Sequence, residues 1–140
     1  DDTDKSSLIT VKAVYDLLAK KGIRTTKTVW PFKPRDRSGI PAQADHWSSG
    51  STLQEPEYLE YCRDLAAQGF EICLPGASLG NNLRGRTLKA FELLDREGFS
   101  SRVFIGHSKN AENPYWEVKF SSSKVVRKLF SLYSRYDDVR

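Results

Sequence analysis

The sequence predicts an α/β fold, in which a parallel sheet of βα units is covered by helices. Three times a helical pattern ends in a glycine that is followed at once by an apolar residue, at Gly22, Gly69 and Gly98. Glycine adopts a left-handed backbone at little cost, and the apolar residue then packs back on the last helical turn. Alternation of helices with short buried strands is typical of parallel sheets. The expected strands are 24–30, 70–74 and 102–106.

The first helix is expected over residues 6–21, with Asp4 or Ser6 as its N-cap. Its apolar residues recur at helical spacing. They are Leu8, Val11, Val14, Tyr15 and Leu18. The threonine- and valine-rich strand that follows ends at Pro31, and residues 31–54 are expected to form a long loop. Trp30, Trp47 and His46 are expected to be loop-packing residues.

The second helix should begin near Pro56, because proline suits the first helical turn. Its expected apolar face consists of Tyr58, Leu59, Cys62, Leu65 and Ala66. A polar loop over 75–82 leads into a third helix, whose apolar residues are Leu88, Phe91 and Leu94. A final amphipathic helix is expected over 121–136.

The composition and charge of the chain argue against some classes of function. The chain of 140 residues fits one domain, and its net charge of +4 comes from basic residues scattered among acidic ones, which argues against nucleic-acid binding. No apolar run approaches the roughly 20 residues of a membrane span. Cys62 and Cys73 both occupy apolar positions. We expect two buried thiols, which favours a reducing, cytoplasmic compartment.

The chain begins at Asp1 and contains no methionine, which predicts a processed product or a piece of a longer protein. In an alternating pattern the first helix follows a strand, so residues 1–4 would be the carboxyl end of that strand. Three complete strands cannot close a barrel. The sheet is therefore open, or residues 1–140 form one domain that is the incomplete N-terminal portion of a barrel. Bare sheet edges would favour a homo-oligomer or the missing remainder of the chain.

Several motifs occur in an order that resembles the polysaccharide deacetylase-like family, and in particular an uncharacterised branch of it. The motifs are Asp1-Asp2-Thr3-Asp4, Tyr15-Asp16-Leu17-Leu18, Gly22-Ile23-Arg24-Thr25-Thr26-Lys27-Thr28-Val29-Trp30-Pro31, Gly50-Ser51-Thr52-Leu53, Gly69-Phe70-Glu71-Ile72, Gly76-Ala77-Ser78 and His107-Ser108-Lys109-Asn110. The resemblance implies a distorted (β/α) barrel of seven or eight units, similar to a TIM barrel, that hydrolyses N-acetyl groups on saccharides.

The resemblance also implies roles for individual residues. Asp1 resembles the catalytic base of the family, and Asp2 resembles a carboxylate that binds a divalent metal such as zinc. The two histidines that complete the family's metal site would fall on Pro75 and Leu79, which cannot bind a metal. The resemblance therefore implies a degenerate metal site, in which His107 acts as an electrophilic or acid partner.

Polar residues after the last expected strand suggest a saccharide or another small polar ligand. Asn110 and Asn113 can each donate and accept hydrogen bonds, and Trp116 offers a flat face to a sugar ring. Asparagine side chains can equally bind the backbone of their own loop. Arg84 lies at the start of the third helix, where backbone amides can hold an anion.

Three hypotheses follow from these residues. The first is a carbohydrate-active deacetylase-like domain, and the second is a non-catalytic carbohydrate-binding or degenerate barrel module. The third is an open doubly wound domain for a phosphate-bearing ligand, which predicts an anion at the start of the third helix.

Overall fold

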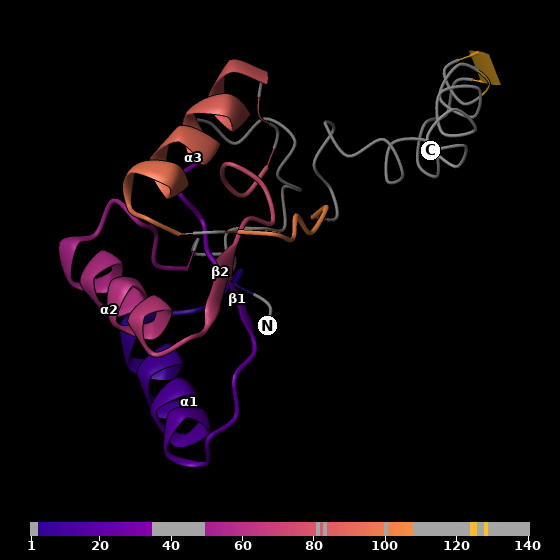
Figure 1. Ribbon diagram of the computed structural model, residues 1–140. Coiled ribbons are helices and arrows are strands. Elements are labelled where there is room, and N and C mark those ends of the chain that lie inside the picture. The colour runs from indigo at the N-terminus through magenta and orange to yellow at the C-terminus, as the bar shows by residue number, and fades with distance from the viewer. Residues whose placement is uncertain are drawn as a thin grey trace.

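The computed structural model describes residues 3–34, 50–80, 82, 84–99, 101–107, 124, 125 and 128. Helices and strands alternate within these residues (Figure 1). The elements are α1 (Leu8–Lys20), β1 (Thr26–Thr28), α2 (Pro56–Ala67), β2 (Glu71–Cys73) and α3 (Arg84–Arg96). The mixed α/β class is therefore confirmed. The described residues form a two-stranded sheet, so closure into a barrel stays a prediction.

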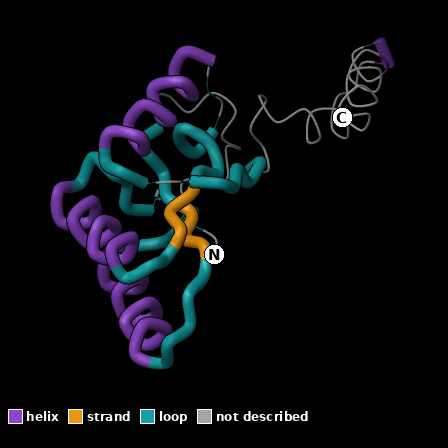
Figure 2. Tube along the Cα trace, viewed as in Figure 1, coloured by secondary structure: helices purple, strands orange, loops and turns teal. Residues whose placement is uncertain are grey.

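The two strands pair in parallel, as the alternation predicts. Thr26 lies opposite Glu71 and Thr28 lies opposite Cys73, and α2 makes the crossover between the strands (Figure 2). Both strands are shorter than expected. The expected strand over 102–106 is wrong as a full strand, because the described residues there make a single parallel bridge, from Phe104 to Leu74.

The three glycines that were expected to follow helices do so, and each adopts a left-handed backbone. Gly22, Gly69 and Gly98 have φ angles of 72°, 90° and 74°. In each case the next residue donates its N–H to a carbonyl five residues back in the helix, as Phe70 does to Leu65 at 3.0 Å. This bond satisfies a carbonyl at the helix end that would otherwise lack a partner, and it turns the chain toward the next strand.

The N-cap of helix α1 lies one residue after Ser6 and three residues after Asp4, the two expected caps. Its N-cap is Ser7, which exchanges hydrogen bonds with Thr10 in a capping box, so Asp4 and Ser6 are wrong as caps. Val11 and Tyr15 are buried as expected. Val14 is 54% exposed, because no other described element covers that side of the helix.

Helix α2 starts at Pro56 and buries Tyr58, Cys62 and Leu65, as the sequence predicts. It packs against α1 and β2. Tyr61 is buried too, and its hydroxyl donates a hydrogen bond to Asp16 of α1 at 2.9 Å.

Helix α3 is rotated relative to the expected face. Leu94 is buried, but Leu88 and Phe91 are exposed, and Ala90 and Leu93 face the core instead. The expected face for α3 is therefore wrong for two of its three residues.

Cys62 and Cys73 are both buried and free, which confirms the expectation of two buried thiols. Burial raises the pKa of the Cys62 thiol to about 12 and that of Cys73 to about 11. Most of the expected helix over 121–136 lies outside the described residues, although Lys124, Val125 and Lys128 are helical.

Glu71 joins three segments at the amino end of the sheet. Its carboxylate accepts hydrogen bonds from the N–H of Arg102 at 2.8 Å and the hydroxyl of Thr26 at 2.9 Å. These donors hold the pKa of Glu71 below its ordinary value, with the Arg102 N–H making the larger contribution. The stability that they provide is present above the ordinary carboxyl pKa and is lost as the pH falls through the folded-state pKa.

We therefore expect Glu71→Gln to lower the urea midpoint of unfolding at pH 7, with the difference from the parent protein shrinking at pH 3. The matched control is Glu92→Gln on the exposed surface of α3, which should leave the midpoint unchanged at both pH values. An equal loss for Glu71→Gln at pH 7 and pH 3 would show that the carboxylate charge is not what stabilises this junction.

Candidate functional site

The segments that leave the carboxyl ends of the strands lie side by side. Phe32, just after β1, donates its N–H to the carbonyl of Ala77, just after β2, at 3.1 Å. The N–H of His107 donates to the carbonyl of Pro75 at 3.1 Å. These bonds bring His107 against Trp30, whose ring centroid lies 5.0 Å away in an edge-on arrangement.

Asp4 completes this cluster from the other end of the chain. Oδ1 of Asp4 lies 2.9 Å from Nε2 of His107, and the two side chains are 10% and 13% exposed. Asp4 is held by its backbone, because its carbonyl accepts the N–H of Gly50 at 2.9 Å. A buried carboxylate beside an imidazole can hold the ring in one orientation. We refer to Asp4, Trp30 and His107 as the Asp4–His107 site.

The Asp4–His107 site contains a buried polar atom, the indole nitrogen of Trp30, which has no hydrogen-bond partner among the described residues. Burial is the main cause that raises the pKa of Tyr58 above its ordinary value, so the phenol is neutral at pH 7. Buried polar groups in native proteins are nearly always paired with protein, water or ligand.

Lys27 is a buried cation on the opposite face of β1. Its ammonium donates a hydrogen bond to the carbonyl of Thr28 at 2.8 Å and lies 5.7 Å from the ring of Tyr15. Residues 27 and 29 share one face of the strand, and Val29 packs in the core beneath the helices. Lys27 therefore belongs to the layer between sheet and helices, whereas Trp30 points the other way.

The structure places only part of the expected site. His107 lies at the carboxyl ends as predicted, and Arg84 is exposed at the start of α3. The remaining residues of the expected site lie outside the described residues: Asp1, Asp2, Asn110, Asn113 and Trp116.

The loop before α3 is held by its own side chains. The amide nitrogen of Asn82 donates to the carbonyls of Ser78 at 3.0 Å and Gly80 at 2.9 Å, and the Ser78 hydroxyl donates to the Asn82 amide oxygen at 2.9 Å. Asn82 is therefore engaged within the loop, and the described residues there give no support for an anion site.

The described residues do not fit a zinc site. They contain no group of three or more His, Cys, Asp or Glu side chains that could hold a metal ion. Asp4 and His107 supply two potential ligands, and a catalytic zinc site uses three. Pro75 and Leu79, which occupy the positions of the family's two histidines, are buried and apolar.

Sequence reasoning missed the roles of Asp4 and Trp30, which it assigned to a helix cap and to loop packing. The only available signal was position, because Trp30 ends a predicted strand and Asp4 precedes the first helix. A pattern within a short window could not pair either residue with His107.

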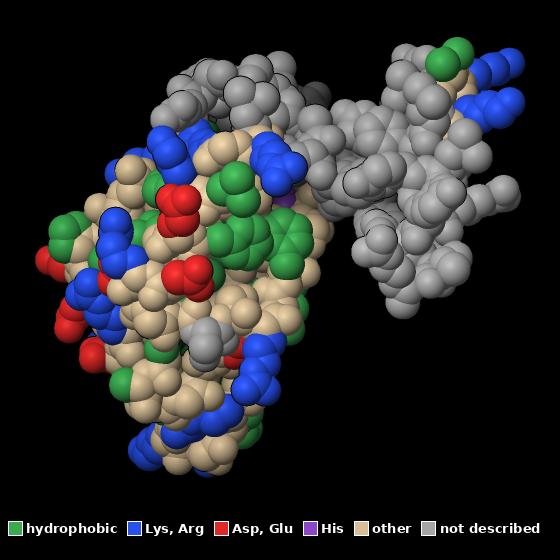
Figure 3. All heavy atoms as spheres, turned by 45° about the horizontal axis from the view of Figure 1, so that its top comes forward, with side chains coloured by type: hydrophobic (Ala, Val, Ile, Leu, Met, Phe, Trp, Pro, Cys, Tyr) green, Lys and Arg blue, Asp and Glu red, His purple; other side chains and the backbone are tan. Residues whose placement is uncertain are grey.

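The fold and the site define a mixed α/β protein with polar side chains gathered at the carboxyl ends of parallel strands. No protein-family model, curated protein or solved structure matches the chain. Among the described residues no helix has the length and apolar character needed to cross a membrane. Figure 3 shows acidic and basic side chains next to each other on one face, in line with the scattered charges of the sequence.

Proposed function

We propose that the chain is part of a polysaccharide deacetylase-like barrel and binds an N-acetylated saccharide at the carboxyl ends of its strands. The observation that carries this proposal is the Asp4–His107 site, which lies where ligands bind in parallel α/β folds. The order of the motifs in the sequence supports the family, and the parallel register supports the arrangement that the family requires.

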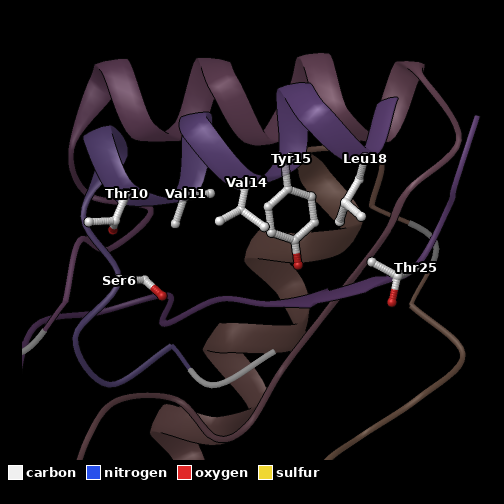
Figure 4. Close-up of a pocket in the computed structure, with 7 residues that line it drawn as sticks. All are labelled: Ser6, Thr10, Val11, Val14, Tyr15, Leu18 and Thr25. Atoms are coloured by element: carbon white, nitrogen blue, oxygen red, sulfur yellow. The ribbon is translucent and has the colours of Figure 1, made fainter. Parts of the chain in front are cut away.

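Apolar surface left open along α1 and beyond β2 supports further βα units. A groove of about 390 Å³ runs along α1 and reaches the start of β1, with side chains of α1 pointing into it (Figure 4). Its lining residues are Ser6, Thr10, Val11, Val14, Tyr15, Leu18 and Thr25. Beyond β2, Phe91 and Phe104 are both exposed, with ring centroids 6.0 Å apart. A barrel would cover the groove and this aromatic pair with neighbouring units.

The Asp4–His107 site suits proton transfer to a leaving amine. The Asp4 carboxylate lies 2.9 Å from Nε2 of His107 and can hold the imidazole ring in place while the ring donates a proton. Loss of an N-acetyl group requires such an acid, because the amine departs only after it gains a proton. Asp1 as base and Asp2 as a metal-binding carboxylate belong to the same proposal through the family resemblance.

The test is the binding of tetra-N-acetylchitotetraose by calorimetry, with acetate release measured in parallel. We expect His107→Ala and Asp4→Asn each to weaken binding about tenfold, since hydrogen bonds to charged groups contribute about 1.5–3 kcal/mol. Glu92→Gln, on the exposed surface of α3, is the control and should bind as the parent protein does.

The outcomes separate the hypotheses. Binding with acetate release supports a deacetylase, and binding without release supports a non-catalytic carbohydrate module. If the parent protein binds neither N-acetylated nor unmodified saccharides at millimolar concentration, the proposed function is wrong.

A further inference from the structure

Three large apolar side chains form an uncovered patch beyond β2. Leu88 and Phe91 of α3 are 48% and 40% exposed, and Phe104 is 50% exposed. Leu88 lies one helical turn before Phe91 on the same side of α3. The rings of Phe91 and Phe104 lie 6.0 Å apart, so the helix and the segment that follows it contribute to one surface. We call these three residues the Phe91–Phe104 patch.

This patch continues the buried face of the sheet. Phe104 pairs with Leu74 in a parallel bridge, and paired residues on neighbouring strands point to the same face. Leu74 is 0% exposed and belongs to the core cluster beneath the helices. Phe104 therefore lies on the face that the helices cover, at a place that α3 leaves half open. A parallel sheet with this face uncovered needs one more helix at this edge.

The chain itself supplies a segment that can reach the patch. Residues 101–107 run past it, and residues 108–120 lead from there to Ser121. At about 3.3 Å per residue, this connection can span about 40 Å, whereas neighbouring helices pack about 8–10 Å apart. Because segment and patch belong to one chain, the effective concentration of the segment is about millimolar. This favours residues 121–136 of the same chain over a second copy.

The sequence of this segment has the apolar side that the patch requires. Its apolar residues recur at helical spacing. They are Val125, Val126, Leu129, Leu132, Tyr133 and Tyr136. Lys124, Val125 and Lys128 are helical, and Val125 is 68% exposed. The segment and the patch thus both carry apolar side chains that face water, and each can cover the other.

We propose that residues 121–136 dock as a helix on the Phe91–Phe104 patch of the same chain. The docked helix follows the segment over 102–106 as α2 follows β1 and α3 follows β2, so it adds one more βα unit to the same helical layer. This inference goes beyond the saccharide site and does not depend on it.

The test is paramagnetic relaxation in the full chain, with a nitroxide on Ser131→Cys. Ser131 falls on the side opposite the apolar residues in a helical projection, so the label leaves the contact intact. The native thiols of Cys62 and Cys73 are buried, and label added to the parent protein should leave its signals unchanged. We expect the amide signals of α3 near Phe91 to lose most of their intensity, and those of α1 to keep theirs.

A mixed sample identifies which chain supplies the helix. Spin-labelled protein without ¹⁵N is added to ¹⁵N-labelled protein without the nitroxide, so only contact between two copies can broaden a signal. We expect no broadening in this sample. Broadening of α3 here would mean that a second copy occupies the patch, and it would overturn the inference. Weak, even broadening of all surface amides in the first sample would overturn it too.

A pair of variants tests whether the apolar side makes the contact. In the spin-labelled protein, Leu129→Asp should abolish the broadening of α3, because a carboxylate in an apolar contact is costly. The matched control is Arg127→Asp, which introduces the same side chain on the opposite side of the projection and should keep the broadening. Unchanged broadening in Leu129→Asp would overturn the inference. The signals of α1 report in both variants whether the domain remains folded.

Discussion

A Gly50→Ala variant is expected to lose about 3 kcal/mol of unfolding free energy, the upper range for inserting an atom into a packed interior. A Cβ atom at this position would lie 2.5 Å from the carbonyl oxygen of Thr3 and 2.6 Å from that of Ser6. Both neighbours are backbone atoms, so no side chain can rotate away to make room.

The surrounding hydrogen bonds make relief of this overlap costly. Gly50 donates its N–H to the carbonyl of Asp4, and Ser51 donates to the carbonyl of Ser6. Moving residues 3–6 away would break both bonds and shift the Asp4 carboxylate relative to His107. We therefore expect Gly50→Ala to lose saccharide binding together with stability.

The matched control is Gly85→Ala in α3, where an added Cβ meets nothing within 4 Å. Alanine is a better helix former than glycine, so this variant should gain about 0.5–1 kcal/mol. Urea unfolding followed by circular dichroism measures both changes. An unchanged midpoint for Gly50→Ala would contradict the close approach of residues 3–6 and 50–51.

Leu65→Ala is expected to cost about 2–5 kcal/mol, the usual range for a buried leucine that leaves a cavity. Leu65 is 0% exposed and belongs to the core cluster that joins α1, α2 and the sheet. Its carbonyl accepts the N–H of Phe70 at the turn into β2, so the residue also marks the junction between helix and strand.

The comparison for this variant is Leu17→Ala, since Leu17 is 55% exposed on α1. Its replacement should change the unfolding free energy by less than about 0.5 kcal/mol. Similar losses for the two variants would show that α2 does not form the centre of the core.

Local patterns predicted much of the fold. The glycines after the helices correctly gave the three turns, because a left-handed residue followed by an apolar contact is a property of a few neighbouring residues. The parallel direction of the strands followed from the alternation of elements. The strand lengths did not, because pairing depends on a partner distant in sequence.

The exposed side of α3 shows why the choice of a helix face can fail. The apolar residues of α3 spread over more than half of the helix circumference. Because Leu88 and Phe91 are large and apolar, an apolar pattern places them, rather than Ala90, on the buried face. The fold places the small Ala90 against the core instead. Close packing of a core depends on the size of each side chain, and the spacing of apolar residues along the sequence does not reveal that size.

The Asp4–His107 contact could not be predicted for a related reason. Each residue carries a local signal, namely a position before a helix or after a strand, but their separation spans most of the chain. The contact arises only after the parallel pairing has brought the segments that follow the strands together.

The pairing of Thr26 with Glu71 also has a consequence for how the chain reaches its native state. The two residues are 45 positions apart, and the sheet gains three residue pairs only after that stretch has closed on itself. Loop closure costs entropy before any pair is formed. The contact of Tyr61 in α2 with Asp16 in α1 also spans 45 positions, so helix docking and strand pairing share one loop closure and should form together.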